Sequence, residues 1–139
     1  MRTQSKTDQP TYGAYRLTAL GTNEIAAKKS FLVFSRNKYI TVATDAIAYF
    51  YVKNEYAIIV CFDKQEYSVN YSLEHIQNVL SELQFFRLNR QYLINFNAVK
   101  EVEHYFARKL LVKLVVPVIE KLLVSKEKGR SFLRWLENR

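Results

Sequence analysis

The stretch from Phe85 to Phe96, with the sequence FFRLNRQYLINF, holds the side chains best suited to binding a polar ligand. Arg87, Asn89 and Arg90 follow two Phe residues and precede an alternating segment that predicts a strand. Because apolar residues hold the backbone on both sides, the three donors form a rigid polar group. Arg and Asn match base edges and phosphates with paired hydrogen bonds. The alternative is a solvated loop that forms salt bridges with neighbouring carboxylates.

Other reactive side chains give no basis for catalysis or metal binding. His75 and His104 have no Cys or carboxylate at the spacing of metal ligands. Glu101 and Glu103 lie two apart on a predicted strand, which indicates a solvated edge rather than an acid–base pair. Cys61, the single cysteine, lies in an apolar run that favours a buried structural thiol. We therefore predict that the protein is not an enzyme and uses no metal and no cofactor.

The charge balance favours a polyanionic partner. The 139 residues include 21 Lys and Arg against 13 Asp and Glu, which gives a net charge of +8. This excess points to nucleic acid first and to an anionic membrane surface second. No apolar run reaches the roughly 18 residues that a membrane span needs, and the first residues lack the apolar segment of a signal peptide. Together with the single cysteine, these features predict a cytoplasmic protein.

A succession of short strands begins at Ser30. Two-residue turns and apolar runs predict strands at Phe31–Ser35, Lys38–Val42, Asp45–Val52, Tyr56–Phe62, Glu66–Val69, Val99–Phe106, Lys109–Val115 and Glu120–Val124. Helices are predicted at Ser72–Leu83 and from Lys126 to about Leu136, the second with Phe132, Leu133 and Leu136 facing inward. The chain is thus expected to be mainly β, with one internal helix and one C-terminal helix.

The first 29 residues differ from the rest. They hold two of the three Gly residues and show no clear period, which predicts a flexible basic arm or linker with a short ordered piece near Ala14–Leu20. Residues 30–139 are expected to form one domain.

Several segments, taken together and in order, resemble the LytTR-type DNA-binding domain of bacterial transcriptional regulators. They are DAIAYFYVKNEY, YSVNYSLEHI, FFRLNRQYLIN, YFARKLLVKL and LLVSKEKGRSFLRWL. The resemblance covers Ser30 to Arg139. It implies about ten short antiparallel strands in three small sheets. It also implies recognition of double-stranded DNA by loops that enter successive major grooves of a direct-repeat site.

The resemblance implies base-edge contacts from three loops. The first holds Lys53, Asn54 and Tyr56, the second holds Arg87, Asn89 and Arg90, and the third holds Ser125 and Lys126. Within these loops Arg90 is expected to donate two hydrogen bonds to a guanine edge, and Arg87 and Asn89 to grip phosphate. Tyr56 can contact a sugar or a thymine methyl group, or it can face the core.

The regulatory context also comes from the resemblance. It implies a response-regulator (two-component) system, a receiver domain or histidine kinase upstream, and a homodimer on tandem DNA half-sites. The arm is too short for a receiver domain of about 120 residues, so the chain is either a stand-alone protein or an excised output domain.

Two alternatives stay open at this point. A LytTR-like protein-interaction or membrane-proximal sensory module would lack sequence-specific DNA binding, but it should neutralise or shorten the three loops. An RNA-binding domain would expose aromatic residues on a sheet face. Tyr39, Tyr49 and Tyr51 are candidates for such a face, although packing in the core explains them more simply.

Overall fold

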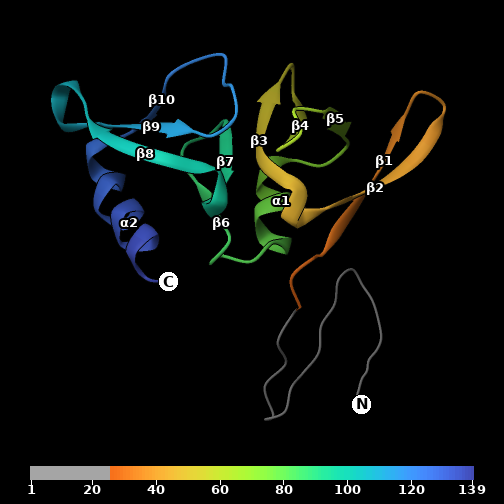
Figure 1. Ribbon diagram of the computed structural model, residues 1–139, viewed down its shortest axis with the longest axis horizontal. Helices are drawn as coiled ribbons and strands as arrows, with labels where there is room; N and C mark the ends of the chain where they lie inside the picture. The colour runs from red at the N-terminus through yellow and green to blue at the C-terminus, as the bar shows by residue number, and fades with distance from the viewer. Residues whose placement is uncertain (1–25) are drawn as a thin grey trace, which may run out of the picture.

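The computed structural model describes residues 26–139, and this part of the chain forms ten strands and two α-helices (Figure 1). The strands make three antiparallel sheets, so the predicted mainly β fold is confirmed. The elements are β1 (Ser30–Ser35), β2 (Lys38–Ala43), β3 (Ile47–Lys53), β4 (Tyr56–Cys61), β5 (Glu66–Val69), α1 (Leu73–Val79), β6 (Phe85–Arg87), β7 (Tyr92–Asn95), β8 (Val99–His104), β9 (Leu110–Leu114), β10 (Leu122–Val124) and α2 (Lys126–Glu137).

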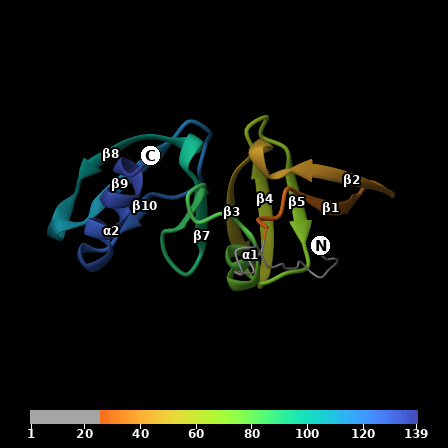
Figure 2. The same cartoon turned by 90° about the horizontal axis from the view of Figure 1, so that it is seen from below.

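A five-stranded sheet with the order β5-β4-β3-β7-β6 forms the centre of the molecule. The β1–β2 hairpin and α1 lie toward one face, and the three-stranded sheet β10-β9-β8 and α2 lie toward the other (Figures 1 and 2). Phe50 belongs to the first of the two resulting cores, whereas its neighbours Tyr49 and Tyr51 belong to the second. Because both faces of β3 are buried, its sequence is an apolar run rather than an alternating pattern.

Aromatic residues attach α2 to the central sheet. The Trp135 ring lies 5.1 Å from the Phe86 ring on β6, and its indole Nε1 donates to the Glu82 carbonyl at 2.8 Å. Phe132 is fully buried and packs 5.2 Å from Phe86. These contacts fix α2 relative to β6, the strand that leads into the β6–β7 loop.

The start of the described chain is already bonded to the domain. The Lys28 amide donates to the Val79 carbonyl at 2.8 Å, and the Lys29 carbonyl accepts from the Thr44 amide at 2.9 Å. Most of the predicted arm, including the piece near Ala14–Leu20, lies outside the described residues.

The predicted internal helix is too long, and the strand after it was missed. α1 ends at Val79 because Leu80 takes an extended conformation and Ser81 then accepts from the Leu83 amide through its hydroxyl. Leu83, predicted to continue the apolar stripe, is 65% exposed. The resulting turn leads into β6, where Phe85–Arg87 pairs with β7 instead of forming part of a loop.

Two further side-chain predictions are wrong. Leu133 is exposed on α2, and Trp135 takes the inward position instead. Tyr49 and Tyr51 are buried as predicted, but Tyr39 is 71% exposed because it lies opposite Phe34 on the outer face of the β1–β2 hairpin. The last predicted strand, Glu120–Val124, is shortened to Leu122–Val124.

The remaining reactive groups behave as structural or surface residues. Cys61 is buried, and desolvation, followed by the nearby charge of Asp63, raises the pKa of its thiol to about 11. His75 stacks on Tyr71 at 4.9 Å. Glu101 and Glu103 form an exposed edge with Lys113. Residues 26–139 contain no group of three His, Cys, Asp or Glu able to hold a metal ion, and no helix suited to crossing a membrane.

Replacing Gly129 with alanine is expected to stabilise the protein by about 0.5–1 kcal/mol, because Gly is a poor helix former. Gly129 is buried inside α2, and an added Cβ would lie 3.5 Å from Leu110 Cδ1, an ordinary van der Waals contact. Urea unfolding of the Gly129→Ala variant would measure the gain. A loss of stability would mean that the contact with Leu110 is tighter than its geometry indicates.

Candidate nucleic-acid interface

The connection between β6 and β7 is a short loop held at both ends. Arg87 pairs with Leu93 in the hairpin, and the Leu88 amide donates to the Tyr92 carbonyl at 3.0 Å. Leu88 is 2% exposed, so its side chain anchors the loop in the core. The next three residues, Asn89, Arg90 and Gln91, are exposed. The loop therefore presents a short polar tip on a fixed base.

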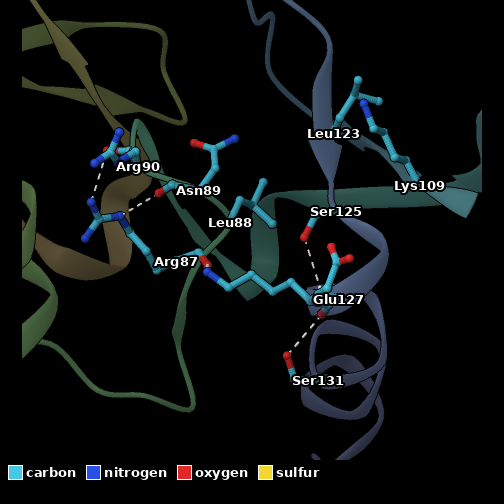
Figure 3. A pocket seen from close by; sticks show the side chains of 10 residues that line it. Arg87, Leu88, Asn89, Arg90, Lys109, Leu123, Ser125, Glu127 and Ser131 are labelled. Atoms are coloured by element: carbon cyan, nitrogen blue, oxygen red, sulfur yellow. Dashed lines mark hydrogen bonds between the residues drawn. The ribbon is translucent and has the colours of Figure 1, made fainter. Parts of the chain in front are cut away.

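Arg87 uses its guanidinium inside the protein. Its Nε donates to the Asn89 carbonyl at 2.7 Å, and one terminal nitrogen donates to the Arg90 carbonyl at 3.0 Å (Figure 3). The other terminal nitrogen donates to Gln77 Oε1 on α1 at 3.0 Å. Burial lowers the pKa of Arg87, and the charge of Glu74 partly offsets this effect. The side chain thus binds the two backbone carbonyls of the loop and links the loop to α1.

Asn89 and Arg90 differ in how they use their side chains. Asn89 Oδ1 accepts from the Gln91 amide at 2.8 Å and from the Tyr92 amide at 3.0 Å, which closes the turn. Arg90 is exposed, and its guanidinium makes no hydrogen bond or ion pair with any residue between 26 and 139. Arg90 is therefore the donor that the loop directs to solvent.

The start of α2 lies beside this loop. Ser125 is the N-cap, and its hydroxyl accepts from the Lys128 amide at 3.3 Å. Lys126 is exposed in the first turn, where backbone N–H groups lack helical partners. Lys128 points back to β6, donates to the Arg87 carbonyl at 3.0 Å and lies 6.0 Å from the centre of the Phe86 ring. This bond ties the helix to the loop.

An open hollow of about 720 Å³ separates the loop from the start of α2 (Figure 3). Four of its lining residues are basic, and one is acidic; these are Arg87, Arg90, Lys109, Lys128 and Glu127. Leu88, Asn89, Leu123, Ser125 and Ser131 complete the lining. With Arg87 and Lys128 engaged in the bonds above, Arg90 and Lys109 supply the cationic groups available at its rim.

The turn between β3 and β4 emerges at the same end of the central sheet. Asn54 and Glu55 have positive φ angles of 51° and 70°, as two-residue hairpins require. The Val52 amide donates to the Gln91 carbonyl at 3.1 Å, which places this turn next to the β6–β7 loop. Tyr56 is 56% exposed, so it does not face the core.

Comparison with known proteins identifies the family. The LytTr DNA-binding domain family matches residues 37–137. The chain belongs to this family. A solved LytTr DNA-binding domain from Bacillus cereus, described as part of a methyl-accepting/DNA response regulator, has the same fold with a TM-score of 0.69. It is 19% identical, and the match covers 80% of this chain and 99% of that one. No curated protein matches the chain.

Membership of the LytTR family makes this chain a DNA-binding domain of the kind used in regulation, and the family is not one of enzymes. The LytTR fold brings the predicted second and third loops together, since Arg87, Asn89, Arg90 and Ser125 line one hollow. Lys126 and the first loop (Lys53, Asn54 and Tyr56) do not line it, although the first loop lies beside the second.

Sequence reasoning missed Lys109 and Lys128, which also line the hollow of this LytTR domain. Lys128 lies two residues beyond the predicted third loop and three residues after the Ser125 cap. This short spacing could have identified it as a residue of the site. Lys109 begins the segment after the β8–β9 connection, and its place in the lining of the hollow follows only from tertiary packing.

Proposed function

We propose that the protein binds double-stranded DNA sequence-specifically to regulate transcription. In this proposal its three adjacent connections reach successive major grooves of a direct-repeat site. The observation that carries the proposal is Arg90, an exposed arginine without a partner among residues 26–139, on a loop whose backbone is held by Arg87 and Asn89. A preorganised guanidinium of this kind suits bidentate binding of a guanine edge.

The other residues take roles that fit their surroundings. Lys53, Asn54 and Tyr56 are exposed at the β3–β4 turn and are assigned to one groove. Lys126 is assigned to the next, and the amides of Lys126 and Glu127, which Ser125 does not cap, are assigned to phosphate. Arg87 and Asn89 are assigned to positioning the loop, because their polar atoms are already bonded within it.

We also propose residues 1–29 as a basic arm and residues 30–139 as the DNA-binding domain. The regulatory context proposed is that of a response-regulator output module, with a receiver domain or histidine kinase upstream. The family match, which covers residues 37–137, supports the domain assignment.

Replacing Arg90 with alanine is expected to flatten base preference at one position of the site by about 1–3 kcal/mol. The site would first be selected from a pool of random duplexes, and affinities would then be measured at several salt concentrations. Arg134→Ala is the matched control, since it removes an exposed arginine from the last turn of α2. Equal binding of all duplexes by the unmodified protein, with one steep salt dependence, would leave only non-specific attraction by its net charge of +8 and refute the proposal.

A further inference from the structure

One face of the β1–β2 hairpin is apolar, and residues 26–139 leave it exposed. Leu32, Phe34 and Tyr39 are 63%, 58% and 71% exposed, while Phe31 and Val33 on the opposite face are buried. Phe34 and Tyr39 are register partners, and their rings meet edge to face at 5.0 Å. The hairpin forms one end of the molecule along its long axis (Figures 1 and 2). We call Leu32, Phe34 and Tyr39 the hairpin face.

The other end of the long axis carries a further exposed aromatic residue. The connection between β8 and β9 lies there (Figures 1 and 2). It presents Phe106, which is 84% exposed, followed by Ala107 and Arg108 with positive φ angles of 61° and 62°. These backbone conformations make the connection a tight projecting turn. Phe106 and Arg108 can both contact aromatic rings, the second through a cation–π interaction.

The proposed DNA contacts are spread along the same axis. The β3–β4 turn, the β6–β7 loop and the start of α2 follow one another from the middle of the molecule toward the end that holds the β8–β9 connection (Figure 1). If these connections enter successive major grooves, the duplex runs roughly parallel to the long axis. Two copies on a direct repeat have the same orientation, so the hairpin end of one copy points to the β8–β9 end of its neighbour.

We propose that the hairpin face docks on the β8–β9 connection of a second copy of this chain, bound to the adjacent half-site. Phe106 and Arg108 of one copy then contact Phe34 and Tyr39 of the next. The contact is heterologous, because two different surfaces meet. This proposal rests on the proposed function and adds to it a source of cooperativity on tandem sites.

The size and charge of the two ends agree with a contact made only on DNA. Each end offers a few side chains, much less than the surface that a stable dimer buries. Arg36 and Lys38 at the hairpin tip and Arg108 at the other end are all exposed and positively charged, so free copies repel each other. DNA supplies neutralising phosphates and a high effective concentration, which lets a weak contact raise the occupancy of the second site.

The test compares one-site and two-site duplexes that contain the selected half-site. We expect the unmodified protein to bind the second half-site at least about fivefold more tightly than an isolated one. Phe34→Ser and Phe106→Ser should each remove this gain and leave one-site affinity unchanged. Tyr71→Ser is the matched control, because it removes an exposed aromatic residue that stacks on His75 and belongs to neither proposed docking surface.

Each outcome separates the two proposals. Specific one-site binding without cooperativity, or cooperativity that survives both serine substitutions, would overturn the head-to-tail contact and keep the proposed function. Absence of any preferred sequence would overturn the proposed function itself.

Cross-linking tests the orientation of the contact. A mixture of Tyr39→Cys and Ala107→Cys proteins should form a mixed disulfide on the two-site duplex and not on the one-site duplex. Cys61 does not compete, because it is buried and has a raised pKa of about 11. A disulfide between two Tyr39→Cys chains on the two-site duplex would show a hairpin-to-hairpin arrangement and overturn the proposal.

Discussion

Replacing Arg87 with alanine is expected to weaken specific DNA binding about tenfold or more, without changing the salt dependence of that binding. Arg87 holds the carbonyls of Asn89 and Arg90 and links them to Gln77 on α1. Without it the loop must order itself when DNA binds, and ordering each residue costs about 1–2 kcal/mol. The measurement is the affinity for the selected site between about 50 and 200 mM salt, the range over which phosphate contacts are most visible.

The salt dependence decides between two roles for Arg87. A phosphate contact would release a counterion, so its loss would reduce the slope of log affinity against log salt by about 1. A positioning residue would lower affinity at an unchanged slope. Gln77→Ala is the matched control, because it removes only the link to α1 and should give a smaller loss. Arg87→Lys should behave like alanine, since an ammonium group cannot form the same fork of hydrogen bonds. A reduced slope for Arg87→Ala would assign Arg87 to phosphate.

The contrast between Arg87 and Arg90 marks the limit of what residue types reveal. Both arginines lie in one polar segment of the sequence that is expected to be exposed, and the side chain of either could bind DNA. Their difference arises from two backbone carbonyls of the closed loop that accept from Arg87, and from Gln77, which lies ten residues earlier on α1. No local pattern encodes that arrangement. The location of the loop was predictable, whereas the role of each arginine within it required the structure.

The strands other than β6 were predictable for a different reason. Arg36 and Asn37, like Asn54 and Glu55, adopt positive φ angles although none of the four is glycine. Positive φ angles are unfavourable for residues with side chains. They occur here because the apolar strands on both sides fix the register, which leaves only two residues to reverse the chain direction. The spacing of the apolar runs, with Asn37 and Asn54 as turn-favouring residues, therefore predicted both hairpins although neither turn contains glycine. The end of α1 was missed because Leu83 fits the apolar stripe, while the Ser81 turn removes it from the helix.

The hollow between the loop and α2 was also beyond sequence reasoning. It forms where the β6–β7 loop meets Lys109, β10 and the start of α2, and the loop is far from the other segments in the chain. The resemblance to the LytTR family named residues from both of its sides, Arg87–Arg90 and Ser125, as DNA contacts, and that role stays a prediction. Lys109 entered the lining only through the packing of the three-stranded sheet, which no motif describes.

Replacing Asn95 with alanine is expected to destabilise the protein by about 2 kcal/mol, because it leaves the buried Ile47 carbonyl without a partner at about 1–3 kcal/mol and removes the acceptor of the Asn97 amide. Asn95 is fully buried at the end of β7. Its Nδ2 donates to the Ile47 carbonyl at 2.8 Å, and its Oδ1 accepts from the Asn97 amide at 2.9 Å. The first bond falls where the pairing of β3 with β4 shifts register between Ile47 and Tyr49, so the side chain supports an irregular point of the sheet.

Urea unfolding followed by the fluorescence of Trp135, the single tryptophan, would measure this loss. Asn97→Ala is the matched control, since Asn97 is exposed and its change should stay within about 0.5 kcal/mol. Asn95→Asp should be at least as harmful as alanine, because it keeps the acceptor, loses the donor to Ile47 and buries a charge. A loss below about 1 kcal/mol for Asn95→Ala would show that another group can replace the amide. A full loss would explain the final asparagine of the FFRLNRQYLIN segment as a structural residue, which leaves direct DNA contact to the exposed side chains of the loop.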